Sequence, residues 1–278
     1  SIAENMGMSP IIIGLTIVSL GTSAPEVLVS FTAALSGAGD LAIGNAIGSN
    51  IANVGLVLGI TVLVAPMMVH ESCMKKEMPT LLVVTIGAGF LLVDDVLSEF
   101  DAWLMVGTLA LIITHMVRSQ SQDAVLVGEA EEEYLTHMAP TRAWLTFLLG
   151  LALLMASSRM LVWGAVVVAE SLGVSELVIG LTIVAIGTSL PELAATIASA
   201  LRGHTEIALG NVIGSNLFNL LAVMSIPGLI SPLDLSPAVL ERDYAAMTIF
   251  TVLLAMAIYF GRLREGARAG HSYVGRSV

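Results

Sequence analysis

The chain contains GLTIVSLGTSAPE at residues 14–26, and nearly the same letters, GLTIVAIGTSLPE, return at residues 180–192. A second segment, GNAIGSNIAN at 44–53, returns as GNVIGSNLFN at 210–219. Both pairs belong to one repeat, because 24 of 47 positions are identical when the chain is aligned with itself at an offset of 166. A lipid environment accepts any apolar residue, yet the identities include Gly, Thr, Ser, Pro, Glu and Asn. The polar positions therefore serve packing, backbone geometry or chemistry.

The composition indicates a protein whose solvent is the lipid bilayer. The chain has 278 residues, is 56% hydrophobic and only 12% charged, and has a net charge of −11. Ordinary soluble domains are roughly 25% charged, so a typical soluble enzyme and a disordered chain are both excluded. Eleven Lys and Arg residues leave no basic patch for nucleic acid, and the single Cys73 cannot form an intrachain disulfide.

Apolar runs long enough for membrane helices predict an all-α polytopic membrane protein. We expect eight spans, at residues 9–35, 42–66, 79–97, 102–117, 144–169, 175–201, 207–230 and 244–260.

The number of spans between the two repeats determines their relative orientation. Five spans lie between the start of the first repeat and the start of the second, and five is odd. The two copies therefore enter the membrane from opposite sides, which is the inverted-topology arrangement of many secondary transporters. This inference depends on the short run 102–117 being a true crossing. We expect a first repeat at 1–117, a cytoplasmic linker at 118–143 and a second repeat at 144–278.

The basic residues agree with this arrangement. Arg242 lies on one side of the eight-span arrangement, whereas the side that the positive-inside rule makes cytoplasmic carries eight basic residues. These are Lys75, Lys76, Arg118, Arg142, Arg202, Arg262, Arg264 and Arg268. We expect a prokaryotic cytoplasmic (inner) membrane.

The ends of the repeats suggest that one helix is absent from each. The second repeat is preceded by the span 144–169, but the first has no equivalent, because position 1 corresponds to position 167. We expect a fragment with eight of ten helices.

Two acidic residues lie inside predicted spans. Glu26 and Glu192 each follow a Pro directly, and a charge at membrane depth costs about 2.5–3.5 kcal/mol on insertion scales. Since Pro disrupts helical hydrogen bonding, we expect the helices to unwind at 21–25 and 187–191 and to free backbone carbonyls for a cation. The alternative is a buried, protonated pair of Glu side chains without an ion.

The repeats supply further oxygen donors near these two carboxylates. The candidate ligands are Thr22, Ser23, Glu26, Ser49 and Asn53 from the first repeat, and Thr188, Ser189, Glu192, Ser215 and Asn219 from the second. Such hard oxygens suit Ca²⁺ and Na⁺ rather than Zn²⁺ or Cu, and two carboxylates neutralise one Ca²⁺. Gly44 and Gly48 are interpreted as packing residues. Four further Asn residues are interpreted as bonding between helices or capping broken ends; they are Asn45, Asn50, Asn211 and Asn216.

The motifs at 21–26 and 44–53, with their copies at 187–192 and 210–219, resemble the two alpha repeats of the sodium/calcium exchanger family in the cation/calcium antiporter superfamily. The resemblance implies a ten-helix fold whose repeats line cation sites near the membrane midplane. It implies ligands at nine positions, namely Thr22, Ser23, Glu26, Ser49, Asn53, Thr188, Ser189, Glu192 and Ser215. Many such exchangers carry Asp where this chain has Asn219, which leaves the stoichiometry and the involvement of protons open.

We therefore expect a secondary antiporter that exchanges Na⁺ for Ca²⁺, without a cofactor, as a monomer and not as an enzyme. A Ca²⁺/H⁺ exchanger of the same superfamily is the nearest alternative. A cation channel is a more distant one, because channels usually build their filters from oligomeric rings.

Overall fold

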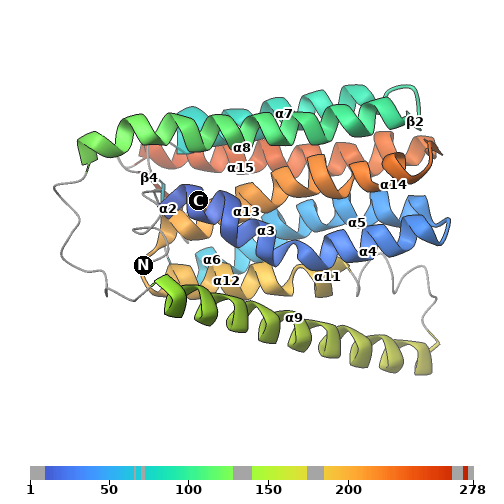
Figure 1. Ribbon diagram of the computed structural model, residues 1–278, viewed down its shortest axis with the longest axis horizontal. Helices are drawn as coiled ribbons and strands as arrows, with labels where there is room; N and C mark the ends of the chain where they lie inside the picture. Colours follow the sequence, from blue (N-terminus) through green and yellow to red (C-terminus); the bar gives the residue numbers. More distant parts are fainter. Residues whose placement is uncertain are drawn as a thin grey trace.

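The computed structural model describes residues 10–65, 67–69, 73–127, 140–173, 185–264 and 272–274. Long helices lie side by side along one direction in this part of the chain, and only short strands accompany them (Figure 1). The prediction of an all-α fold is therefore confirmed.

The first repeat forms two interrupted helices. The first is made of α2 (Pro10–Ile13), the π-helical segment η1 (Gly14–Val18), α3 (Ser19–Thr22) and α4 (Ala24–Leu35). It bends by 50° between Gly14–Thr22 and Ala24–Leu35. The second is made of α5 (Gly39–Ala52), the π-helical segment η2 (Asn53–Leu58) and α6 (Gly59–Val64).

The second repeat has the same local structure where it is described. Its elements are α11 (Ala185–Thr188), α12 (Leu190–Leu201), α13 (Thr205–Phe218), the π-helical segment η5 (Asn219–Val223) and α14 (Ser225–Ile230). Gly37 and Gly203 occupy equivalent turns with φ of 78° and 82°, a conformation that Gly adopts without steric cost. The start of the predicted span 175–201 lies outside the described residues.

The repeats run in opposite directions, as predicted. In Figure 1, α3 leads into α4 from the centre toward the right, whereas α11 leads into α12 from right to left. At one end of the molecule, β2 (Val96–Leu97) pairs with β3 (Leu233–Asp234) beside Gly39. At the other end, Thr205 donates a hydrogen bond to the carbonyl of Met68 in β1 (Met67–Val69), which pairs with β4 (Ser272–Val274). Equivalent turns of the two repeats thus lie at opposite ends.

The remaining helices flank the repeats, and several differ in length from the predicted spans. They are η3 (Cys73–Glu77), α7 (Met78–Leu91), α8 (Glu99–Val127), α9 (Pro140–Ser171), η6 (Val239–Tyr244) and α15 (Ala245–Arg264). The predicted span 79–97 is too long, because α7 ends at Leu91 and Asp95 follows with a φ of 57°. The short predicted span 102–117 belongs to a helix of 29 residues that continues into the predicted linker.

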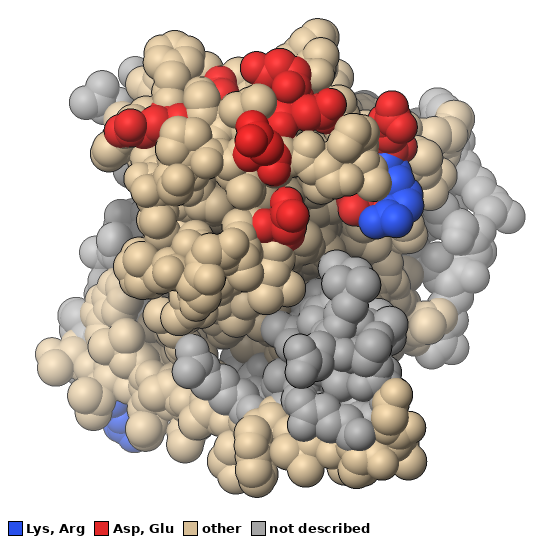
Figure 2. Space-filling view, turned by 90° about the vertical axis from the view of Figure 1, so that its right-hand side faces the viewer, with Lys and Arg blue, Asp and Glu red and all other residues tan. Residues whose placement is uncertain are grey.

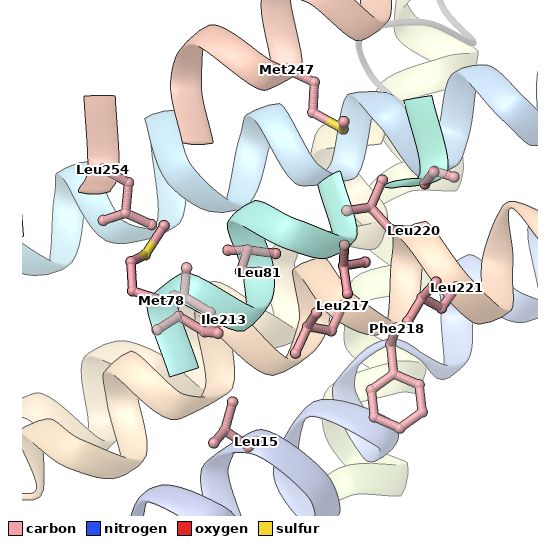
Figure 3. Packing of buried hydrophobic residues seen from close by; sticks show 14 of the residues in the cluster. Leu15, Met78, Leu81, Ile213, Leu217, Phe218, Leu220, Leu221, Met247 and Leu254 are labelled. Atoms are coloured by element: carbon pink, nitrogen blue, oxygen red, sulfur yellow. The ribbon is translucent and has the colours of Figure 1, made fainter. Parts of the chain in front are cut away.

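The helix α13 lies at the centre of the described structure. In the continuous helix Thr205–Ile230, which α13 begins, 89% of the apolar stretch is buried inside the molecule. In the equivalent helix Gly39–Val64 of the first repeat, the buried share is 39%. Figure 3 shows Ile213 and Leu217 of α13 together with Met78 and Leu81 of α7. Two glycines allow η1 and α13 to approach closely: an ideal Cβ on Gly14 would lie 2.5 Å from the carbonyl oxygen of Ile207, and one on Gly214 2.5 Å from that of Leu15.

The outer surface and the two ends suit a membrane. Four described helices are long and apolar enough to span one, or five if the bent pair Gly14–Thr22 and Ala24–Leu35 counts as a single span. Large apolar side chains such as Phe90, Trp103 and Leu111 are exposed on the outside. Acidic residues gather at the end that carries β2 and β3 (Figure 2). They include Asp40, Asp94, Asp95 and Asp234.

Candidate functional site

Two helix breaks with the same geometry place the two buried carboxyl groups. Ser23 has φ −82° and ψ 5°, and its repeat equivalent Ser189 has φ −83° and ψ 2°. A Pro follows each break, and Glu26 and Glu192 come next, in the first turn of α4 and α12. The N-terminus of a helix favours negative charge, so each break presents its carboxylate with a favourable backbone field.

The breaks are narrower than the sequence predicts. Residues 21–25 do not unwind, since the amide of Ser23 still donates to the carbonyl of Ser19 at 2.9 Å and that of Val27 to the carbonyl of Ser23 at 3.2 Å. The helix bends at the single residue Ser23. Pro25 lies in the first turn of α4, where the N–H that proline lacks has no partner within the helix. The second repeat is the same, because only Ser189 separates α11 from α12. The prediction that the helices unwind over 21–25 and 187–191 is therefore wrong.

The carboxyl groups of the two repeats meet in the interior. Both Glu side chains are fully buried and interact electrostatically with each other. Ser23 Oγ of the first repeat donates to Glu192 Oε1 of the second at 3.0 Å. Glu192 also has Thr22 and Ser215 beside it, and Glu26 has the repeat-equivalent residues Thr188 and Ser49. Seven of the ten predicted ligands are therefore the two Glu residues themselves or residues beside one of their carboxyl groups.

The other three predicted ligands are also buried. Asn53 begins η2, which packs against α12, and Asn219 begins η5, which packs against α4. Asn53 Nδ2 donates to Asn216 Oδ1 of the second repeat at 3.1 Å. Its hydrogen bond to the other repeat is therefore to an amide and not to Glu192. Ser189 lies at the second helix break, next to Thr188.

Many oxygen atoms in this region have no hydrogen-bond partner among the described residues. They belong to both carboxylates, to three hydroxyls and to two amides, namely Glu26 Oε1 and Oε2, Glu192 Oε2, Ser49 Oγ, Ser189 Oγ, Ser215 Oγ, Asn53 Oδ1 and Asn219 Oδ1. A buried polar atom without a partner costs about 1–3 kcal/mol. Such a collection of buried acceptors has the chemistry that a bound cation would satisfy.

The chemistry of the donors indicates which cation fits. No group of three or more His, Cys, Asp or Glu side chains suited to a metal occurs within the described ranges. The set consists instead of two carboxylates with neutral hydroxyl and amide oxygens, the donors that Ca²⁺ and Na⁺ prefer. Neither carboxyl group has a Lys or Arg among the described residues that influence it.

Two Asn residues that the sequence assigns to bonding between helices hold the backbone of the Glu residues. Asn45 Nδ2 donates to the carbonyl of Glu26 at 3.2 Å and to Ser30 Oγ at 3.1 Å. In the second repeat, Asn211 Nδ2 donates to the carbonyl of Glu192 at 3.4 Å and to Thr196 Oγ1 at 2.9 Å.

Across the repeats, Thr22 Oγ1 donates to Asn211 Oδ1 at 3.2 Å. The roles of Ser30 and Thr196 are not predicted from the sequence. The signal for them was a hydroxyl kept at equivalent positions, although the residue type differs.

Comparison with known proteins places the chain among exchangers. Residues 1–118 and 142–273 match the family described as sodium/calcium exchanger protein. CaxA of Alkalimonas amylolytica is 46% identical over 95% of this chain and 84% of its own length. The inner membrane protein YrbG of Escherichia coli K12 is 39% identical over 97% of this chain and 84% of its own length. A solved structure of the sodium-calcium exchanger NCX_Mj, soaked with Na⁺ and Ca²⁺, superimposes with a TM-score of 0.80 at 30% identity and covers 99% of this chain and 84% of that one.

Proposed function

The chain belongs to the sodium/calcium exchanger family, and from this premise we propose that it exchanges Na⁺ for Ca²⁺ across a membrane at a site built around Glu26 and Glu192. The two halves of the transporter are residues 1–117 and 144–278, joined by a cytoplasmic linker at 118–143. A relative of 30% identity, MaX1 of Methanosarcina acetivorans, is named a sodium/calcium exchanger, and this name supports the choice of ions.

One observation carries the proposal: two fully buried carboxylates, one from each repeat, lie close together without a described basic partner. Their two negative charges equal the charge of one Ca²⁺. Ca²⁺ takes six to eight oxygen ligands, so the neighbouring hydroxyl and amide oxygens would complete its coordination. Several Na⁺ ions would occupy the same oxygens in competition with it.

The burial of the carboxylates gives a physical reason for obligatory exchange. Unpaired charges in the membrane interior are costly, at several kcal/mol each, so the empty site would oppose a change of state. A bound Ca²⁺, or a set of Na⁺ ions, compensates the charge and favours the state that can switch. One cation must therefore replace another before the site opens to the opposite side.

Exchange of Ca²⁺ for H⁺ is the second candidate, and the same pair of carboxylates supports it. Two acidic groups with no basic neighbour in the described part of the chain can be neutralised by protons as well as by Na⁺. Asn219 favours neither candidate, because its amide does not titrate.

Everted vesicles of the inner membrane distinguish these candidates. In such vesicles the side of the protein that its basic residues predict to be cytoplasmic faces the assay medium. Ca²⁺ uptake is measured with a Na⁺ gradient and with a pH gradient, each imposed alone. We expect uptake to follow Na⁺. Uptake that responds only to pH supports the H⁺ candidate, and Ca²⁺ flux that needs no cation on the opposite side indicates a channel.

Substitution of the two carboxylates tests the site itself. We expect Glu26→Gln and Glu192→Gln each to abolish Ca²⁺ uptake, because removal of one charge leaves Ca²⁺ uncompensated. Glu241→Gln, the same change at an exposed acid, is the matched control and should keep the parent rate. If either buried variant exchanges at the parent rate with normal expression, the ligand assignment is wrong.

A further inference from the structure

The amide of Asn53 is held at one end and open at the other. Its Nδ2 donates to Asn216 Oδ1 at 3.1 Å, while its Oδ1 has no partner among the residues described. Both side chains are buried, with exposed fractions of 0% and 1%. Because the two ends of an amide differ, a bond that occupies the nitrogen end determines that the oxygen end faces the remaining space.

The equivalent pair in the other half is arranged differently. Asn219 corresponds to Asn53, but neither end of its amide has a partner in the described part of the chain. Asn50 corresponds to Asn216, and its Nδ2 points to the carbonyl of Asn216 and to Met247 Sδ, at 3.4 Å each. Asn50 Oδ1 accepts no bond from a described residue. The two halves therefore contain the same residues but only one of the two amides is held.

We propose that Asn216 is a positioning residue that keeps the Asn53 amide turned with its oxygen toward the bound cation. The inference rests on the proposed function, since it assigns a role within the same site. A cation is attracted to the oxygen end of an amide and repelled by its NH₂ end, so an amide that rotates freely binds the cation less well. Asn216 Oδ1 faces Asn53, while Asn216 Nδ2 has no partner among the described residues, so this single bond holds the pair of amides. Turning the Asn53 amide alone would bring two oxygen atoms together.

The test compares the loss of Asn216 in two backgrounds. Asn216→Leu removes the acceptor at similar size, and we expect it to raise the KM for Ca²⁺ about tenfold, with little change in the maximal rate. In the Asn53→Asp background the carboxylate presents an oxygen in either orientation and needs no positioning. There Asn216→Leu should raise the KM less than about threefold.

The control is Asn50→Leu, the same substitution at the repeat-equivalent position. It removes a buried amide that does not contact the side chain of Asn53, so its effect on KM should be the same in both backgrounds. If Asn53→Asp abolishes transport, the same comparison is made with purified protein, by the increase in Tm on adding Ca²⁺.

The possible results separate this inference from the proposed function. A parent chain that neither binds nor exchanges Ca²⁺ overturns both. A parent that exchanges Ca²⁺ while Asn216→Leu leaves KM unchanged, or raises it equally in both backgrounds, overturns the positioning role alone.

Discussion

At the scale of single residues, a substitution at Asn219 is the simplest way to add a charge to the proposed site. It is fully buried at the start of η5, and its amide has no described partner. The equivalent Asn53 is uncharged too, so the site as a whole carries two carboxylates. The number of cations exchanged in each cycle should depend on this count.

We expect Asn219→Asp to make Ca²⁺ uptake depend more steeply on Na⁺, because a third carboxylate requires another monovalent cation to compensate it. The Hill coefficient for Na⁺ measures this dependence. Asn219→Leu changes the same side chain without adding charge and should not raise the coefficient. An unchanged coefficient in Asn219→Asp would show that the carboxylate does not face the exchanged ions.

Cys73, the only cysteine of the chain, is fully buried in the segment that connects α6 to α7. Burial raises the pKa of its thiol, with the nearby Glu77 and Glu206 as further causes. Since the thiolate is the reactive form, we expect maleimide to label Cys73 only after denaturation. Rapid labelling of the native protein, at the rate of an exposed control such as Ser36→Cys, would contradict the packing described here.

The sequence predicts which residues form the candidate site, but not which of them are hydrogen-bonded to each other. The positions of Glu26 and Glu192 and of their hydroxyl-bearing neighbours follow from the repeat, because equal residues recur at a fixed offset. The pairing of Ser23 with Glu192, and of Asn53 with Asn216, does not follow. Those bonds join residues 169 and 163 positions apart, and they depend on how the two repeats pack.

At the scale of elements, close contact between helices depends on glycine. The Cβ of an alanine at Gly14 would meet the backbone of α13, which cannot move as a flexible side chain does. We expect Gly14→Ala to destabilise the protein by about 1–3 kcal/mol, measured by thermal unfolding in detergent.

Gly107 in α8 provides the matched control, because nothing lies within 4 Å of its added Cβ. Gly107→Ala should be neutral or stabilising by up to about 1 kcal/mol, through reduced freedom of the unfolded chain. Equal effects of the two substitutions would mean that η1 and α13 do not approach as closely as described.

The ends of the elements were harder to predict than their existence. Hydropathy extends the third span to residue 97, because Leu92, Val93, Val96 and Leu97 are apolar. The structure instead uses Leu97 in the strand β2, where it is fully buried against the rest of the molecule. Apolar composition alone does not distinguish a buried connection of this kind from a membrane helix.

At the scale of the whole molecule, the opposite direction of the repeats is open to a direct test. Ser36 and Arg202 occupy equivalent positions and are both exposed. In a Cys73→Ala background, we expect Ser36→Cys to react with an impermeant thiol reagent from outside the cell and Arg202→Cys from the cytoplasmic side. Labelling of both from the same side would exclude the inverted arrangement.

The matching backbone angles at Ser23 and Ser189 have a consequence for rectification, the tendency of a carrier to work faster one way than the other. At the proposed site, an ion arriving from either face would meet equivalent serines in mirrored order, so the rates of transport in the two directions should differ little. Ser19 lies four residues before the first break, and its equivalent Ala185 has no side-chain oxygen. We therefore expect Ser19→Ala to bring the rates of forward and reverse Ca²⁺ movement closer together, as isotope fluxes measured both ways would show.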